Sequence, residues 1–317
     1  MDYSVVIPIY NEEEVLRVCY TRLKEVMDKS EGLYELIFVN DGSHDSSLQI
    51  LKDICKNDKN IRVISLSRNF GHQNAITAGM DYAKGNAVVV IDADLQDPPE
   101  VILQMIDKWK EGYHVVYGKR KKREGETFFK KVSAKIYYRL LSRLTNVDIP
   151  VDTGDFRLID RAVCDNLKNL EEKNRYIRGL VSWVGFNQTY IEYDRAERYA
   201  GETKYPLKKM IKFGVDGITS FSYKPLKFAA NIGFLISIGS FLNIIYIFYQ
   251  SLVLDTTVEG WASTMSVILF TQGIVLMMLG LMGEYIGRIF QEVKGRPIYL
   301  VQEAIGMKDE DTKKDSM

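Results

Sequence analysis

The stretch that most constrains the fold of this chain is residues 88–99, which read Val-Val-Val-Ile-Asp-Ala-Asp-Leu-Gln-Asp-Pro-Pro. Four β-branched residues in a row predict a buried strand. Pro98 and Pro99 cannot donate ladder hydrogen bonds, so the strand ends before them. Asp92 and Asp94 are two residues apart and fall on the same side of an extended chain, with Gln96 following them. Ligands bind at the carboxyl ends of strands in open α/β sheets, so these side chains form a candidate site.

The chemistry of this candidate site is that of a hard metal ion. Oxygen ligands from Asp92, Asp94 and Gln96 suit Mg²⁺ or Mn²⁺, which are usually shared with substrate phosphates. The alternative is a solvated acidic turn after a core strand, which is the commoner meaning of an isolated Asp-x-Asp. The remainder of the chain favours the site over the turn.

Strand-like and helix-like segments alternate through the first hundred residues. Buried strands are expected at residues 3–10, 35–39, 61–66 and 88–91, and helices are expected after residue 11, after residue 47 and over residues 74–83. This alternation predicts an α/β fold with a mostly parallel, doubly wound sheet. The strand ends near Tyr10, Asp41 and Asp92 would then lie on one edge of that sheet.

Composition and missing motifs exclude several classes. Basic and acidic residues balance at 42 each, so no net charge attracts the chain to nucleic acid. The sequence has neither a G-x-x-x-x-G-K-[ST] loop nor a G-x-G-x-x-G turn, which argues against a kinase or a dehydrogenase. The three cysteines and three histidines show no metal-ligand spacing, and reduced thiols in a cytosolic compartment are expected.

Five motifs in order carry a family resemblance. Residues 6–12, 39–43 and 92–98 resemble the family-2 inverting glycosyltransferases of the GT-A fold, and more narrowly the polyisoprenyl-phosphate glycosyltransferases such as dolichol-phosphate mannose synthase and the bacterial bactoprenol glucosyltransferases. Residues 66–73 and 152–158 match the bacterial branch. The resemblance covers nearly the whole chain.

The resemblance implies roles for particular residues. Asp92, Asp94 and Gln96 would handle the metal, and Asp155 would face the acceptor phosphate and the anomeric carbon, with Asp152 as its rival. Because the acceptor phosphate is already ionised near neutral pH, Asp155 could position substrate rather than act as a strong base. The residues expected to surround the nucleotide are Pro8, Tyr10, Glu12 and Asp41.

Basic residues are expected to hold phosphates. By resemblance, Arg120 contacts phosphate, and Lys131 or Lys135 joins it. Arg198 and Lys204 belong to the family's R-x-x-G-x-[ST]-K loop, where two cations across a glycine turn could close over a pyrophosphate.

Two long uncharged stretches predict membrane attachment. Residues 228–254 and 260–283 contain 27 and 24 residues without a charge, and about 20 suffice to cross a bilayer as a helix. Residues 119–143 hold ten basic and two acidic residues among apolar ones at helical spacing, as expected of a helix on an anionic membrane surface. Basic residues flank the two spans on their outer sides, which places the catalytic domain and both termini in the cytoplasm. The predicted division is a GT-A catalytic domain (1–204), amphipathic juxtamembrane helices (205–227), two transmembrane helices (228–288) and a cytosolic tail (289–317).

These features predict an inverting glycosyltransferase of the bacterial inner membrane. It would move a sugar from a nucleotide sugar, foremost UDP-glucose, to polyprenyl (undecaprenyl) phosphate on the cytoplasmic face. Another donor, such as UDP-N-acetylglucosamine, GDP-mannose or UDP-aminoarabinose, stays open, as does a catalytically inactive membrane scaffold. Expected partners are the lipid bilayer, further copies of the chain in a homo-oligomer, and a flippase and a downstream transferase that use the product.

Overall fold

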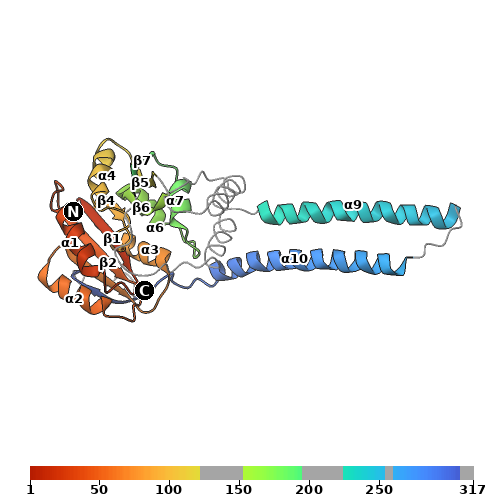
Figure 1. Ribbon diagram of the computed structural model, residues 1–317, viewed down its shortest axis with the longest axis horizontal. Coiled ribbons are helices and arrows are strands. Elements are labelled where there is room, and N and C mark those ends of the chain that lie inside the picture. The colour runs from red at the N-terminus through yellow and green to blue at the C-terminus, as the bar shows by residue number, and fades with distance from the viewer. Residues whose placement is uncertain (122–152, 195–223, 254–259, 308–317) are drawn as a thin grey trace. The chain divides into compact units, whose positions relative to one another are not determined.

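The computed structural model describes residues 1–121, 153–194, 224–253 and 260–307 (Figure 1). The described elements form two compact units. One holds every described element from β1 to β7 together with β8, and the other holds helices α9 and α10.

The first unit is built on an eight-stranded sheet with the order β7-β5-β6-β4-β1-β2-β3-β8. Strands β4, β1, β2 and β3 are mutually parallel, β6 and β8 run antiparallel to their neighbours β4 and β3, and β7 runs parallel to β5. The predicted α/β fold with a mostly parallel sheet is confirmed. The strands are β1 (Tyr3–Ile9), β2 (Tyr34–Asn40), β3 (Ile61–Leu66), β4 (Ala87–Val90), β5 (Val115–Arg120), β6 (Thr153–Asp160), β7 (Gln188–Tyr193) and β8 (Val301–Ile305).

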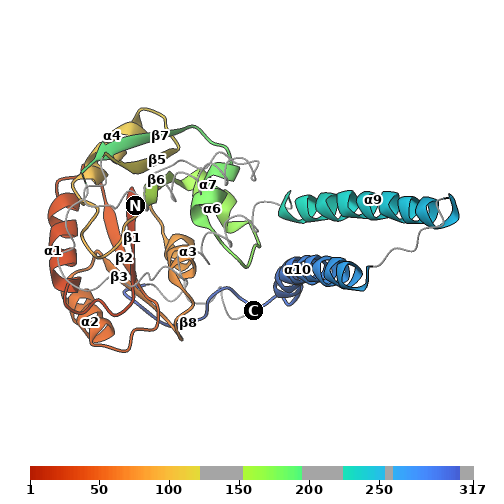
Figure 2. The same cartoon turned by 45° about the vertical axis from the view of Figure 1, so that its right-hand side comes forward.

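Helices cover both faces of this sheet (Figure 2). Helix α1 contacts α2 and α4 on one face, and α6 contacts α3 and α7 on the opposite face. The central strands β1, β2 and β4 are buried along their whole length, which explains their continuous apolar runs. The helices of this unit are α1 (Leu16–Met27), α2 (Ser47–Asn57), α3 (His72–Tyr82), α4 (Val101–Lys110), α6 (Arg161–Lys168) and α7 (Ile177–Trp183).

Helices α1 and α3 begin at other residues than the sequence pattern predicts. Helix α1 begins at Leu16, so the acidic residues 12–14 lie in the turn before the helix instead of in its first turn. Asn11 adopts a positive φ of 52°, which turns the chain sharply after β1 and delays the helix. Helix α3 begins at His72, two residues earlier than expected, and this brings His72 and Gln73 to its amino end.

Strand β8 lies within residues 289–317, where the sequence predicts a cytosolic tail and no strand. It pairs antiparallel with β3, and the Ser67 N–H donates to the carbonyl of Leu300 just before it. Tyr299 donates its hydroxyl hydrogen bond to Asp81 at the end of α3. Residues 301–305 are therefore part of the sheet.

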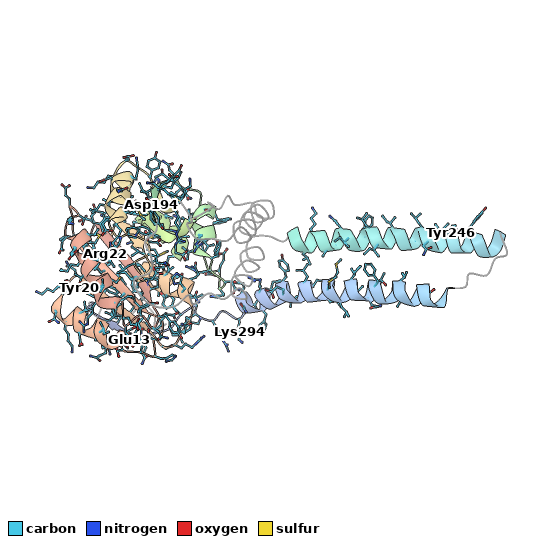
Figure 3. The ribbon with its side chains drawn as sticks, in the orientation of Figure 1. Glu13, Tyr20, Arg22, Asp194, Tyr246 and Lys294 are labelled. Atoms are coloured by element: carbon cyan, nitrogen blue, oxygen red, sulfur yellow. The ribbon has the colours of Figure 1, made fainter. Side chains whose placement is uncertain are left out.

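The second unit contains α9 (Lys224–Val253) and α10 (Trp261–Val293). The stretch Phe270–Val293 is the one described segment that is long and apolar enough to cross a membrane, judged by length and composition, and a shorter apolar stretch, Ala229–Asn243, lies in α9. Large side chains project from both helices, such as Tyr246 of α9 (Figure 3), which is more than half exposed. Two long helices thus stand where the pair of transmembrane helices is expected, and both membrane spans stay predictions.

Candidate active site

The turns after β1 and β2 are joined by hydrogen bonds at the carboxyl edge of the sheet. The Asn11 N–H donates to Ser43 Oγ at 3.0 Å, and the His44 N–H donates to Asn11 Oδ1 at 2.8 Å. Ser47 Oγ accepts from the Glu12 N–H at 3.0 Å. Short polar side chains at both strand ends therefore replace the backbone partners that the turns lack.

Asp41, at the end of β2, fixes the loop that leads into α3. Its two carboxylate oxygens accept the Phe70 N–H at 2.7 Å and the Gly71 N–H at 3.0 Å. The carboxyl is buried, and burial raises its pKa although both N–H groups oppose that rise. Holding this loop determines where the next residues, His72 and Gln73, lie.

Asp155 is the centre of the site. Antiparallel pairing places Arg157 of β6 opposite Val90 of β4, so the register brings Asp155 alongside the residues that follow β4. The carboxylate is 7% exposed and accepts from Arg178 Nε at 2.8 Å and Arg178 Nη2 at 3.2 Å. Gln73 Nε2 donates to the same carboxylate at 3.2 Å. Burial alone would raise the pKa of Asp155, but Arg178 and His72 hold it well below its usual range.

His72 lies between two carboxylates. Its Nε2 is 3.4 Å from Asp92 Oδ1 and 3.3 Å from Asp155 Oδ2. Burial opposes the charged imidazole, but the two carboxylates raise the pKa of His72 to about 9. Burial also raises the pKa of Asp92 to about 6 against the influence of His72, and Asp155, Asp97 and Asp94 reinforce that rise. His72 and these carboxylates are therefore electrostatically coupled at this edge.

A second polar cluster involves Asp97, Arg120 and Tyr193. Asp97 is 2% exposed, accepts a short hydrogen bond from the Tyr193 hydroxyl and pairs with Arg120 Nη2 at 3.4 Å. Arg120 and Tyr193 are the last residues of β5 and β7. An added Cβ at Gly154 would lie 3.1 Å from Arg120 Nη2, so the absence of a side chain there makes room for the guanidinium.

The remaining predicted residues on the described chain lie on the same edge. Pro8 is buried in β1, while Tyr10 is 37% exposed in the turn after it. Asp94 and Gln96 follow β4 on half-buried positions, and Asp94 Oδ1 accepts the Gln96 N–H at 3.1 Å. The structure thus gathers the predicted residues Pro8, Tyr10, Glu12, Asp41, Asp92, Asp94, Gln96, Arg120 and Asp155 around one sheet edge.

The other predicted residues, Asp152, Lys131, Lys135, Arg198 and Lys204, lie outside the described residues. The same holds for most of the predicted amphipathic segments. Within the described ranges, no group of three or more His, Cys, Asp or Glu side chains is arranged to hold a metal ion. Asp92 Oδ1 is nevertheless buried without a hydrogen-bond partner among the described residues, and Asp94 is close enough to raise the pKa of Asp92. A carboxylate oxygen that accepts no hydrogen bond, and has only the His72 imidazole nearby at 3.4 Å, fits a divalent cation.

Sequence reasoning missed His72, Gln73 and Arg178. The histidines lacked metal-ligand spacing, and that test does not detect a histidine that pairs with two distant carboxylates. His72 and Gln73 belonged to a recognised motif, which was a signal for them, whereas Arg178 lies in no motif that the sequence singled out. Its role depends on the packing of α7 beside β6.

Fold and site together define the class of this protein: an α/β enzyme domain with its candidate catalytic centre at the carboxyl edge of a mostly parallel sheet. Comparison with known proteins identifies the family. The model described as glycosyl transferase family 2 matches residues 4–168, and the model described as GtrB C-terminal hairpin matches residues 224–289. The chain belongs to glycosyl transferase family 2 and is a glycosyltransferase, as its motifs indicated.

Relatives match along nearly the full length. The uncharacterised glycosyltransferase YkcC of Bacillus subtilis (strain 168) is 60% identical over 309 residues, covering 98% of this chain and 96% of the relative. The SfII prophage-derived bactoprenol glucosyl transferase of Shigella flexneri is 40% identical over 304 residues, covering 96% of this chain and 98% of the relative. A solved structure, glucosyl-3-phosphoglycerate synthase from Mycobacterium tuberculosis with Mn²⁺, uridine diphosphate and phosphoglyceric acid, overlaps at a TM-score of 0.46 and 20% identity, covering 69% of this chain and 76% of that chain.

Proposed function

We propose that this glycosyltransferase moves glucose from UDP-glucose to polyprenyl (undecaprenyl) phosphate at the cytoplasmic face of the bacterial inner membrane. The observation that supports this most strongly is the 40% identity, over 98% of its length, to a relative named bactoprenol glucosyl transferase. The alternative of a catalytically inactive membrane scaffold is disfavoured, because Asp92, Asp94 and Asp155 are all present in the candidate site and are electrostatically coupled.

The lipid acceptor agrees with the second unit. Helix α10 has 33 residues, which corresponds to about 50 Å and exceeds the hydrocarbon core of about 30 Å. We propose that α9 and α10 both span the bilayer, with the termini and the catalytic unit in the cytoplasm. A phosphate held at headgroup depth would then meet a donor that arrives from the cytosol.

The transfer needs few protein groups. An oxygen of the acceptor phosphate attacks the anomeric carbon, the bond from that carbon to the donor diphosphate breaks, and the electron pair leaves with the nucleoside diphosphate. Attack from the face opposite the leaving group inverts the configuration. Asp155 would orient the reacting groups, because a carboxylate whose pKa is held so low by Arg178 and His72 is a poor proton acceptor.

A divalent cation, Mg²⁺ or Mn²⁺, would be held by Asp92 and Asp94 with Gln96 nearby. When bound, it would neutralise charge on the departing diphosphate. The nucleotide would be surrounded by Pro8, Tyr10, Glu12 and Asp41, and phosphate oxygens would be bound by Arg120, Lys131, Lys135, Arg198 and Lys204. Asp41 already accepts two backbone N–H groups, and Arg120 already pairs with Asp97. Each would therefore hold a substrate group in addition to, or in exchange for, these partners.

The decisive experiment is a donor panel with the purified full chain in lipid. The chain is incubated with undecaprenyl phosphate, Mg²⁺ or Mn²⁺ and labelled UDP-glucose, UDP-N-acetylglucosamine, GDP-mannose or UDP-aminoarabinose, and the lipid fraction is extracted. We expect label in the lipid from UDP-glucose. Transfer from another donor would keep the reaction and correct the sugar, whereas an unlabelled lipid with every donor would refute the proposed acceptor.

A further inference from the structure

We propose that Arg178 and Gln73 are positioning residues for the transfer reaction, which together clamp the Asp155 carboxylate in one orientation. This inference rests on the proposed function, in which Asp155 faces the reacting groups. It concerns two residues of different elements, α7 and α3, that meet on a third, β6.

Arg178 binds Asp155 with the geometry that restricts a carboxylate most. Its Nε and Nη2 contact the two different oxygens of Asp155, at 2.8 and 3.2 Å. Its Nη1 donates to the carbonyl of Thr153 at 3.2 Å, so the guanidinium is itself held by the strand that carries the carboxylate. A two-point contact between planar groups fixes rotation as well as distance, which a single ammonium cannot do.

Gln73 closes the arrangement from the other side. Its Nε2 donates to Asp155 Oδ2 at 3.2 Å, and its Oε1 accepts the Ile177 N–H at 2.9 Å. Ile177 immediately precedes Arg178, so one amide connects the carboxylate to the first turn of the helix that supplies its arginine. The three side chains and the start of α7 form a closed hydrogen-bonded ring.

The ring has a consequence for the reaction. Because Asp155 is almost completely buried and held on both oxygens, its position depends on α3 and α7 remaining in place. A positive charge alone would keep Asp155 paired, but only the two-point contact would keep it aligned. Loss of alignment should lower the rate of the chemical step and leave binding of the donor largely unchanged.

The test compares Arg178→Lys and Gln73→Met with the matched control Arg175→Lys. Arg175 is three residues before Arg178, is partly buried and donates only to backbone carbonyls in the described chain. We expect Arg178→Lys to lower kcat by about ten- to a hundredfold and Gln73→Met by about tenfold, with KM for the donor within about twofold of the original. Arg175→Lys should retain the original kcat and KM.

The double variant Arg178→Lys with Gln73→Met separates a shared clamp from two unrelated effects. If both act on one carboxylate, the double variant should lose little more kcat than Arg178→Lys alone, because residues that act as a unit are non-additive. Fully multiplicative losses, or losses that appear in donor KM with kcat unchanged, would overturn the clamp. A normal kcat in both single variants would overturn it as well, and melting temperatures show that all variants fold.

Failure of the clamp can be told apart from failure of the proposed function. If the unmodified chain labels a different acceptor or only hydrolyses the donor, the proposed acceptor is wrong, and the same variants are measured on that reaction. If the unmodified chain transfers sugar to undecaprenyl phosphate but the variants do so equally fast, only the clamp is wrong.

Discussion

At the scale of single residues, the site is a balance of charges that compensate one another. Asp155 is nearly buried and would be costly as an isolated charge, yet Arg178, His72 and Gln73 all direct donors toward it. Asp92 is less well compensated, since its buried Oδ1 has no hydrogen-bond partner among the described residues. Asp155 is therefore held on both oxygens by the protein, whereas Asp92 Oδ1 has only His72 nearby, at 3.4 Å, and accepts no hydrogen bond among the described residues.

The separate roles proposed for Asp94, as a metal ligand, and for Asp155, as an aligned group, predict separate phenotypes. Asp94→Ala and Asp155→Asn should each lower transfer at least about a hundredfold, because the first would remove a proposed metal ligand and the second a proposed positioning group. Titration calorimetry with UDP and Mg²⁺ should show that only Asp94→Ala loses the metal-dependent part of donor binding. Near-normal turnover by Asp155→Asn would remove Asp155 from the mechanism.

Gly79 illustrates a residue whose size is limited by packing. An added Cβ on this α3 residue would lie 2.2 Å from Val6 Cγ1 and 3.1 Å from Val39 Cγ2, both on buried strands. Valine side chains cannot rotate away easily, so Gly79→Ala should destabilise the fold by about 1–2 kcal/mol after its gain in helix propensity. A fall in melting temperature of the full chain in detergent checks this, with the exposed Thr21→Ala as the control.

At the scale of elements, the C-terminal strand β8 is attached through backbone pairing and a few specific contacts. Gly306, just after β8, has a φ of +76°, and an added Cβ would lie 2.7 Å from the Ile61 carbonyl oxygen and 2.9 Å from Cys55 Sγ. Lys52 pairs with Glu303 at 2.6 Å, but both side chains are partly exposed. The backbone geometry at Gly306 should therefore matter more than the ion pair.

We accordingly expect Gly306→Val to loosen β8. Hydrogen–deuterium exchange of residues 299–306 should accelerate by about tenfold or more, because the variant adds strain and a clash at the point where the strand ends. Exchange in the central strand β1 should stay unchanged. Lys52→Met should leave the exchange of β8 nearly as it is, and equal effects of the two variants would contradict this account.

Helices α1 and α2 are joined by a small network at Asp58, which follows α2. Asp58 accepts hydrogen bonds from Lys24 Nζ at 2.7 Å and from the Tyr20 hydroxyl at 2.9 Å. Figure 3 labels Tyr20 on α1. Burial would raise the pKa of Asp58, but Lys24, the Asn60 N–H and Tyr20 hold it below the usual value. The network therefore favours the ionised carboxylate.

The sign of the pH dependence follows from that lowered pKa. The stabilisation is fully present above the unfolded-state pKa, near 4, and is lost as pH falls through the lower folded-state pKa. Asp58→Asn should cost about 1 kcal/mol at pH 7, a modest value because Lys24 is 36% exposed, and the cost should shrink as pH falls below about 4. Melting temperatures of both proteins across this range check it, and a difference that grows toward low pH would contradict it.

At the scale of the whole molecule, the chain combines a catalytic sheet unit with a pair of long helices. We expect both helices to span the membrane, which would place residues 254–259 outside the cytoplasm. Thr256→Cys in a Cys55→Ser background should react with a membrane-impermeant thiol reagent in intact cells, since the two other cysteines are buried. Labelling of Thr256→Cys only after permeabilisation would exclude the two-span topology.

Much of the fold could be predicted because its signals are local. The apolar strand of residues 88–91 and its following carboxylates marked both the sheet and the edge that carries the site. Strand β8 escaped prediction because residues 301–305 have only a short apolar pattern with a glutamate and a glutamine, and their pairing with β3 is set by tertiary packing. The two long helices could be predicted, by contrast, because their uncharged stretches are longer than a soluble core needs.

By itself, the sequence determined the α/β class, the family, the order of the motifs and the identity of the acidic residues at the strand ends. Only the tertiary structure decided that β6 runs antiparallel to β4, which brings Asp155 alongside Asp92. It also decided that α3 and α7 direct His72, Gln73 and Arg178 to the Asp155 carboxylate. The physical reason is that a strand's period is written in its own residues, whereas its neighbour and direction depend on contacts between segments far apart in the chain.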